Sequence, residues 1–325
     1  VYKRQMGPRA IFYYNDVFRV DLPDNHRFPM GKYESVRRSL QNELREGAVF
    51  RVSPTATFDE LCTTHARSYV ERVLNDELTR DELRRIGFPG GPQSIARATS
   101  SVGGTLAAAR ALFEPGAPRV TAHIAGGTHH AFWDRGEGYC VFSDIAVAAN
   151  CILREQPSVR SCLVVDCDVH QGNGNAVLFK DEHRVFTFSM HCAGNYFSPV
   201  EASDLDIEVP IGAGDAEYCG KLEAVLPPLF HALAPQLVFF QGGVDPLAND
   251  RYGKLQLSRA GLRRRNEAVF GLCAQHGVPL VVTMGGGYPR DMRAGSADTF
   301  QVIQAHMDVY RGAAQLQNNA ARWAR

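Results

Sequence analysis

The sequence predicts an α/β fold with a central, mainly parallel sheet that helices cover on both faces. Short apolar segments alternate along the chain with segments of helical character, which is typical of parallel sheets. Four of the expected strands run directly into glycines beside polar side chains, at 126–130, 166–174, 242–245 and 285–288. Because sites in parallel sheets form at the carboxyl ends of strands, we expect one site built from these four loops.

Strands are expected where short runs of apolar residues occur. In chain order they are 10–14, 119–124, 162–170, 184–191, 205–209, 236–240 and 278–282. The segment 205–209 lies inside a long loop over 195–214, and a loop with two prolines, 21–30, follows the first strand.

Helices are expected where residues recur at helical spacing or where alanine is abundant. In chain order they are 32–46, 58–83, 95–113, 144–154, 215–233, 258–276 and 297–315. Gly47 should end the first helix, and Ser258 is a suitable cap for the sixth. Two adjacent prolines, Pro227 and Pro228, should kink or split the fifth.

Size, charge and composition narrow the class of protein. With 325 residues, 45% of them hydrophobic, the chain can bury a large core, and the lack of repeats or linkers favours a single domain over 1–325. The 35 basic and 35 acidic residues balance, so we expect neither nucleic acid nor membrane as a partner. The N-terminus lacks the apolar core of a signal peptide, and eight cysteines without a C-x-x-C pair favour a reduced, cytoplasmic setting.

The most informative stretch is Val-Val-Asp-Cys-Asp-Val-His-Gln-Gly-Asn-Gly at 164–174. If 162–170 is a strand, Asp166, Asp168 and His170 share one face, because strand side chains repeat every two residues. A single D-x-D at a strand end often only forms a turn or caps a helix. Three potential ligands at alternate positions of an apolar strand favour a site.

Asp168, His170 and Asp245 form a candidate metal site. Two oxygens and one nitrogen suit a divalent ion with open positions for water and substrate, as in catalytic sites. Such an ion polarises a carbonyl and lowers the pKa of bound water. Zinc and iron(II) both accept this set of ligands.

The tandem His129-His130 follows two glycines at a strand end and adds two candidate acid–base groups. A lone histidine is more often structural, but a pair at this position favours chemistry. Asp166 and Asn173 are candidates to orient the two rings through their second nitrogens. Tyr288, after three glycines, is a candidate donor to a developing oxyanion. Together these residues predict metal-assisted hydrolysis of a carbonyl compound.

Four motifs resemble those of the zinc-dependent histone deacetylase superfamily, which includes acetoin-utilisation proteins and acetylpolyamine amidohydrolases. They are Gly-Gly-Thr-His-His at 126–130, Asp-Cys-Asp-Val-His-Gln-Gly-Asn-Gly at 166–174, Gly-Gly-Val-Asp-Pro-Leu-Ala-Asn-Asp at 242–250 and Gly-Gly-Gly-Tyr at 285–288. The His-Gln-Gly-Asn version looks most like the class IV branch and its bacterial relatives. The resemblance implies an arginase-like, three-layer fold with an eight-stranded parallel sheet.

The resemblance also implies roles for the site residues. Three of them would bind zinc, namely Asp168, His170 and Asp245. His130 would serve as general base and acid, His129 as its electrostatic partner and Tyr288 as the oxyanion donor. Asp166 would pair with His129, and Asn173 with His130. Since Asn173 is neutral where class I enzymes carry a carboxylate, His130 should be less basic than its class I counterpart.

Two further sites follow from the resemblance. A potassium site would be formed by Asp166, the hydroxyl of Ser189, and the backbone carbonyls of Asp168, His170 and Met190. An acyl-lysine tunnel would have Tyr139, after Gly138, as one aromatic wall, and Tyr196 or Phe197 as the other. His26 and Phe28 match a segment of the rim.

The resulting hypothesis is an amidohydrolase that removes acetyl or longer acyl groups from lysine side chains through metal-activated water. The same chemistry on acylpolyamines or other small amides is the first alternative, and no rim aspartate like the class I substrate clamp is recognisable near 76–91. A ureohydrolase with two manganese ions would need a further carboxylate that 245–249 lacks. A non-catalytic binding module would be favoured by loss of Tyr288 or of a ligand, and all are present. The remaining histidines at 183, 231, 276 and 306 are expected at the surface or at helix ends.

Overall fold

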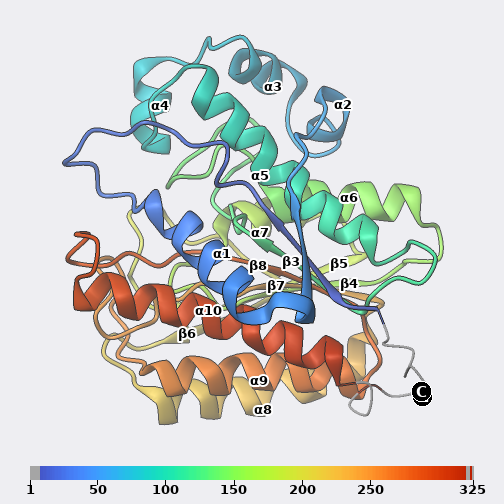
Figure 1. The fold of residues 1–325 in the computed structure, drawn as a ribbon. Coiled ribbons are helices and arrows are strands. Elements are labelled where there is room, and N and C mark those ends of the chain that lie inside the picture. Colours follow the sequence, from blue (N-terminus) through green and yellow to red (C-terminus); the bar gives the residue numbers. More distant parts are fainter. Residues whose placement is uncertain (1–7, 320–322, 324–325) are drawn as a thin grey trace.

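A computed structural model describes residues 8–319 and 323, and an eight-stranded sheet forms its centre (Figure 1). All strand pairs are parallel, in the order β2-β1-β3-β8-β7-β4-β5-β6, so the predicted α/β class is confirmed. The strands are β1 (Ala10–Tyr14), β2 (Ala48–Val52), β3 (Val120–Ile124), β4 (Cys162–Asp166), β5 (Val185–Cys192), β6 (Leu205–Val209), β7 (Leu237–Gln241) and β8 (Leu280–Thr283).

Helices cover both faces of this sheet (Figure 1). One face carries α1 (Gly31–Leu44), α8 (Asp215–Leu233), α9 (Arg259–Gln275) and α10 (Ala297–Asn318). The other carries α5 (Pro92–Ala111), α6 (Asp144–Glu155) and α7 (Asn173–Phe179), with the short helices α2 (Phe58–Leu61), α3 (Arg67–Leu74) and α4 (Arg80–Ile86) beyond α5. A 3₁₀ turn, η1 (Arg45–Gly47), joins α1 to β2.

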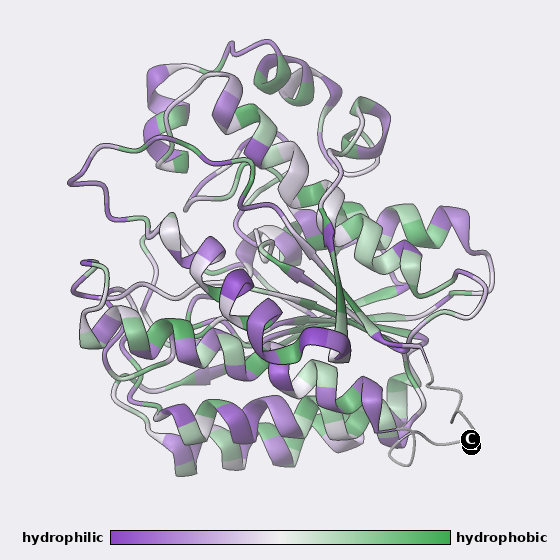
Figure 2. Cartoon of the chain, in the orientation of Figure 1, coloured by the Kyte–Doolittle hydropathy of each residue, from purple (hydrophilic) through white to green (hydrophobic). Residues whose placement is uncertain are grey.

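The core consists of two hydrophobic clusters, one on each face of the sheet. Figure 2 shows that hydrophobic residues concentrate on the strands and that the helices carry hydrophilic residues on their outer sides. Burial of both sheet faces explains why the strands are apolar runs without polar alternation. Within the described residues, no helix combines the length and the apolarity that a membrane crossing requires.

The topology gathers the four glycine-rich loops. The motifs at 126–130, 285–288, 242–245 and 166–174 follow β3, β8, β7 and β4, which are four adjacent strands in the middle of the sheet. Because all the strands are parallel, their carboxyl ends meet at one edge. The predicted convergence of the four loops is therefore a direct consequence of the strand order.

Several expected elements differ from the structure. The single helix over 58–83 is wrong, because α2 and α4 each begin at a threonine, Thr57 and Thr79, that forms its own capping box. The split expected at the two prolines is also wrong, since α8 runs through both. Sequence reasoning missed β2, a half-exposed edge strand beside β1, and the short helix α7.

Candidate active site

Asp168 and His170 lie in a turn after β4, which corrects the strand expected over 162–170. The strand ends at Asp166, whose Oδ1 accepts the N–H of Asp168 at 3.1 Å. Asp168 Oδ1 in turn accepts the N–H of His170 at 3.1 Å. These side-chain acceptors take the place of a neighbouring strand and end the β conformation. The shared-face argument was therefore wrong beyond Asp166, although all three side chains still reach the same site.

Asp168, His170 and Asp245 form a cluster with the spacing of metal ligands. His170 Nδ1 lies 3.2 Å from Asp168 Oδ1 and 3.4 Å from Asp245 Oδ2. Ligands arranged tetrahedrally at zinc–ligand distances of about 2.0–2.1 Å are separated by about 3.3 Å. The three atoms are therefore spaced as ligands of one ion.

Asp245 provides an independent test of this fit. It is fully buried, and its Oδ1 accepts the N–H of Val169 at 2.9 Å. Its Oδ2 has no hydrogen-bond partner of good geometry. A buried carboxylate oxygen without a partner costs free energy, and a cation bound at that oxygen would remove the cost. The residues present therefore fit a divalent metal.

The electrostatics of the cluster also favour a cation. Burial and the adjacent Asp168 raise the pKa of Asp245 to about 7. Against the effect of burial, the close carboxyl groups of Asp168 and Asp245 raise the pKa of His170 to about 10. Both pKa shifts indicate that positive charge between Asp168 and Asp245 would stabilise these two buried carboxyl groups.

Glycines let the backbone approach the cluster closely. A Cβ at Gly286 would collide with Asp245 Oδ2, and one at Gly243 would collide with Asp168 Oδ2. The N–H of Gly286 donates to that Asp168 oxygen at 2.7 Å. The glycines before Asp245 and Tyr288 are thus required by space beside the ligands.

The tandem histidines pair as the resemblance implied. His129 Nδ1 lies 2.6 Å from Asp166 Oδ2, an acceptor, so this ring donates. His130 Nδ1 lies 2.7 Å from Asn173 Oδ1, which also accepts the N–H of Gly174 at 3.0 Å. Because that backbone bond marks Oδ1 as the amide oxygen, His130 carries its proton on Nδ1 and leaves Nε2 free to accept one.

The two histidines differ in basicity although both are buried. Burial lowers the pKa of His130 well below its usual range, and the neighbouring rings of His129 and His170 lower it further. Burial acts on His129 in the same direction, but the charges of Asp166 and Asp168 outweigh it and raise the pKa of His129. The structure therefore places a weakly basic imidazole beside a more basic one.

Asp144 fixes the loop that carries these histidines. It is fully buried at the first position of α6, where a carboxylate is stabilised by the helix dipole. Its oxygens accept the N–H groups of Gly127 at 3.0 Å and Thr128 at 2.7 Å, and the hydroxyl of Thr105 at 2.6 Å. The loop position is thus set by charge-assisted hydrogen bonds from one side chain.

Tyr288 is held from two sides. The carboxylate of Asp250 accepts its N–H at 2.6 Å and that of Tyr252 at 2.8 Å. The buried Lys32 donates from Nζ to the carbonyl of Gly287 at 3.0 Å and lies 5.2 Å from the centre of the Tyr288 ring. Burial raises the pKa of Tyr288 well above its usual value, so the hydroxyl keeps its proton and can donate it in a hydrogen bond.

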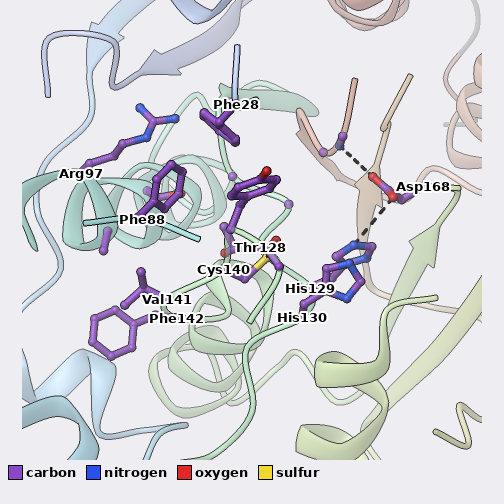
Figure 3. Close-up of a pocket in the computed structure, with 18 of the residues that line it drawn as sticks. Phe28, Phe88, Arg97, Thr128, His129, His130, Cys140, Val141, Phe142 and Asp168 are labelled. Carbon is purple, nitrogen blue, oxygen red and sulfur yellow. Dashed lines mark hydrogen bonds and ion pairs between the residues drawn. The ribbon is translucent and has the colours of Figure 1, made fainter. Parts of the chain in front are cut away.

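Two cavities meet at this site. The outer cavity, about 580 Å³, and the inner one, about 70 Å³, share five lining residues. These are His130, Gly138, Tyr139, His170 and Tyr288. Figure 3 shows the inner cavity running from His129, His130 and Asp168 to an aromatic end beside Phe28, Phe88 and Phe142, with Arg97 nearby. The candidate reacting groups therefore lie between an outer cavity and a smaller inner one.

The expected tunnel residues divide between these cavities. Tyr196 stacks on His130 with ring centres 4.0 Å apart, whereas Phe197 is 71% exposed at the mouth. Phe28 is buried against Tyr139, with ring centres 4.9 Å apart, and so lies inside rather than at the rim. His26 lies behind this wall, where its Nε2 is 2.9 Å from the carbonyl of Gly87.

Three of the five residues expected to hold potassium lie on two paired strands, and the other two, Asp168 and His170, lie in the turn after β4. Asp166 and Ser189 are register partners on β4 and β5, and Met190 follows Ser189 in the buried part of β5. The hydroxyl of Ser189 lies 3.1 Å from His191 Nδ1. The structure thus brings the two side chains of the expected site together.

Sequence reasoning missed several residues that support the site. They are Lys32, Glu137, Asp144, Asp250, Tyr252 and Arg265. Arg265 is fully buried in α9 and donates to the carbonyls of Cys167 at 3.1 Å and Gly242 at 3.2 Å, which ties together the loops after β4 and β7. The surface position expected for His306 was wrong, since it is fully buried in α10. Of these residues, Asp144 could have been noticed from its local sequence, because Ser143-Asp144 is a typical start of a helix.

Comparison with known proteins agrees with this geometry. A family model for the histone deacetylase domain matches residues 26–303, which include all four motifs. An uncharacterised protein of Picosynechococcus is 37% identical over 286 residues, which are 86% of this chain and 92% of that protein. Histone deacetylase 2 of Arabidopsis thaliana is 33% identical over 299 residues, covering 88% of this chain and 76% of the plant protein. Histone deacetylase RPD3 of Saccharomyces cerevisiae is 30% identical over 259 residues, covering 74% of this chain and 58% of the yeast protein.

Proposed function

The chain belongs to the histone deacetylase family, and we propose that it hydrolyses the amide bond of acylated lysine side chains with the help of a divalent metal. The observation that carries this proposal is the meeting of three groups at one point. The Asp168–His170–Asp245 cluster, the free Nε2 of His130 and the hydroxyl-bearing Tyr288 surround the junction of the two cavities. A cavity that leads to candidate metal ligands, a base and a donor suits a long side chain with a terminal amide.

Each residue of the site would have its own role in the reaction. A divalent ion held by the cluster would polarise the amide carbonyl and lower the pKa of water beside it. His130 accepts the proton of the attacking water at Nε2 and returns it to the leaving lysine amine. Tyr288 donates its hydroxyl hydrogen to the developing oxyanion. His129, kept charged by Asp166, stabilises the negative charge that accumulates at the site.

The charge of the entrance favours an acyl-lysine in a peptide over an acylpolyamine. Arg84, Arg85 and Lys254 line the outer cavity, and no described Asp or Glu does so. A polyamine carries several ammonium groups, which this lining would repel. The same lining should favour acidic residues beside the acylated lysine.

The lining of the inner cavity bears on which acyl chains the site can accept. The far end of this cavity is lined by aromatic side chains, among them Phe28, Phe88 and Phe142 (Figure 3), and by the polar side chains of Ser94 and Arg97. An acyl chain that passes the metal cluster would enter this space, so we propose acetyl or a longer chain as the group removed. We also propose that the metal is zinc and that potassium binds beside Asp166 and Ser189. The His-Gln-Gly-Asn motif supports a place in the class IV-like branch of the family.

Turnover of a substrate panel tests the proposal. The panel contains lysine peptides acylated from acetyl to myristoyl, each with acidic or basic neighbours, together with acetylated polyamines. Zinc-loaded wild type is compared with Asp245→Ala and Tyr288→Phe. We expect turnover of lysine peptides, faster with acidic neighbours, that both substitutions abolish or nearly abolish. Turnover of polyamines alone would move the substrate to small amines, and a zinc-loaded wild type that cleaves nothing would favour a binding module.

A further inference from the structure

Asn173 makes hydrogen bonds on both sides of its amide. Its oxygen accepts from His130 Nδ1 at 2.7 Å and from the N–H of Gly174 at 3.0 Å. Its nitrogen donates to Glu137 Oε1 at 3.1 Å. Asn173 is 1% exposed and Glu137 is 3% exposed. The base is therefore linked through a neutral amide to a buried acidic side chain.

The position of Glu137 is fixed by its own loop. Glu137 lies between two glycines, and a Cβ at Gly138, where φ is +56°, would collide with the Tyr196 hydroxyl. The carbonyl of Glu137 accepts the N–H of Cys140 at 2.9 Å, and Gly138 N–H donates to the carbonyl of Arg85 at 3.1 Å. These bonds anchor the peptide unit that joins Glu137 to Gly138.

Glu137 forms no ion pair among the described residues. The side-chain hydrogen bond that it accepts comes from the amide of Asn173. Tyr196 lies on the other side, stacked on His130 at 4.0 Å, and its buried hydroxyl is beside Glu137 without a hydrogen-bond partner of good geometry. Water is therefore kept away from the hydrogen bond between Asn173 and Glu137, whereas Nε2 of His130 faces the cavities.

Hydrogen bonds in such a chain polarise one another. An acidic oxygen that accepts from the amide nitrogen draws positive charge to that end and increases the negative charge on the amide oxygen. Low solvent exposure strengthens the effect, because water does not screen it. The Nδ1–H of His130 thus faces a stronger acceptor than an isolated asparagine would offer.

We propose that Glu137 is a positioning residue that acts on His130 through Asn173. A carboxylate at position 173 would place negative charge directly against His130. Glu137 supplies part of that effect through the intervening amide of Asn173. The proposal rests on the proposed function in so far as His130 is the base of that reaction. It assigns a role to a buried carboxyl group that the proposed chemistry does not otherwise use.

A double-mutant cycle tests this role. Glu137→Gln keeps the size of the side chain and an acceptor for Asn173 but removes the acid. In the wild-type background we expect it to lower kcat about tenfold, as loss of an orienting partner does, with KM little changed. In the Asn173→Asp background the same substitution should raise kcat, because it replaces one of two adjacent carboxyl groups, which would otherwise repel each other, by a neutral amide. An equal fold-change in both backgrounds, or no change in the wild-type background, would overturn the proposal.

Nuclear magnetic resonance provides a readout that does not need turnover. In protein labelled with ¹⁵N-histidine, the His130 Nδ1 proton should move upfield in Glu137→Gln, because its hydrogen bond weakens. An unchanged proton shift contradicts the proposal even if the variant is active. If wild type cleaves no substrate, the proposed function fails while this shift still decides the role of Glu137.

Two controls separate this role from folding. Asp308→Asn removes another mostly buried carboxylate, which pairs with Arg259 at the α9–α10 contact, and should lower the unfolding temperature without changing kcat. Glu137→Asp retains the acid on a shorter side chain and should recover part of the kcat that Glu137→Gln loses. If Glu137→Asp and Glu137→Gln lose the same activity, the side chain acts through packing and the proposal is wrong.

Discussion

His129 and His130 are neighbours in the chain and almost equally buried, at 3% and 4% exposure, yet their surroundings differ. His129 faces two carboxylates, with Nδ1 at 2.6 Å from Asp166 and Nε2 at 3.8 Å from Asp168. His130 faces the amide of Asn173 at 2.7 Å. The pKa is raised in the first ring and lowered in the second. The comparison teaches that the charge of the partner, rather than residue type or burial, assigns each histidine its role.

The two rings also influence each other. Their centres are 3.9 Å apart, so a proton on His129 disfavours a proton on His130. His129 is therefore the more basic ring, and the proposed function assigns proton transfer to His130. The two identical residues differ because Asp166, at the end of β4, lies beside one ring and Asn173, at the start of α7, lies beside the other.

Removal of each ring in turn should have the largest effect. His130→Ala should lower kcat by about 10²–10⁴, because it removes proton transfer. His129→Ala should cost about tenfold, as expected for a group that supports the charge of the site. The check is kcat of both variants on one acyl-lysine peptide at saturating zinc. A greater loss in His129→Ala would reverse the assignment of the two rings.

Tyr288→Phe should have the next largest effect, a loss of about 10²–10³ in kcat with KM little changed, because one oxyanion donor is removed. Tyr310→Phe is the matched control. Its hydroxyl donates to the carbonyl of His123 at 2.7 Å in a fully buried position. The control should lower stability and leave kcat unchanged. Equal kcat losses in the two variants would mean that Tyr288 acts through stability alone.

Exchange of the neutral partner should make the two histidines alike. Asn173→Asp places a carboxylate against His130 and should raise its pKa by about one unit or more. Because His130 must be unprotonated to accept a proton, the acid limb of the kcat/KM profile should move to higher pH. Profiles of wild type and variant between pH 5 and 8 provide the measurement. A limb that stays in place, or moves to lower pH, would show that another group controls it.

A third histidine extends the comparison to stability and should give the smallest effect. Burial lowers the pKa of His123 to about 3, whereas an unfolded chain has a histidine pKa of about 6.5. Below pH 6.5 the histidine is protonated in the unfolded state but stays neutral in the folded state. The free energy of unfolding therefore falls as the pH drops. At pH 5.5 the cost is about 1.4 kcal/mol relative to neutral pH. In His123→Gln, the difference in unfolding free energy between pH 7.5 and 5.5 should shrink by that amount, and an unchanged difference would contradict the assignment.

The parts of the site that follow from backbone periodicity could be predicted from the sequence. Apolar strands ending in glycine and polar residues located all four loops, and the partners of His129 and His130 followed from the family motif. The turn at Asp168 could not be predicted, because alternation of ligands in the sequence does not distinguish a strand from a turn stabilised by Asp166 Oδ1. Glu137 was missed because its loop is shaped by contacts with Arg85 and Tyr196, which are distant in the sequence.

In the fold, as in the site, the elements marked by a local pattern could be predicted, and those that depend on tertiary contacts could not. Buried strands such as β4 and β7 are continuous apolar runs and were expected within a few residues of their bounds. The edge strand β2 (Ala-Val-Phe-Arg-Val) is half exposed and follows η1 directly, so neither burial nor a turn signal marked it. Lys32 and Arg265 are charged residues on helices, and only their tertiary contacts with loop carbonyls reveal that they are buried.

The protonation states of the two tandem histidines test the account most directly. Nuclear magnetic resonance of ¹⁵N-histidine in zinc-loaded protein at pH 7, with His129→Ala and His130→Ala for assignment, reports both nitrogens of each ring. The account predicts a doubly protonated His129, and a neutral His130 with its proton on Nδ1. A neutral His129 beside a doubly protonated His130 would contradict it, because the ring that must accept a proton would already carry one.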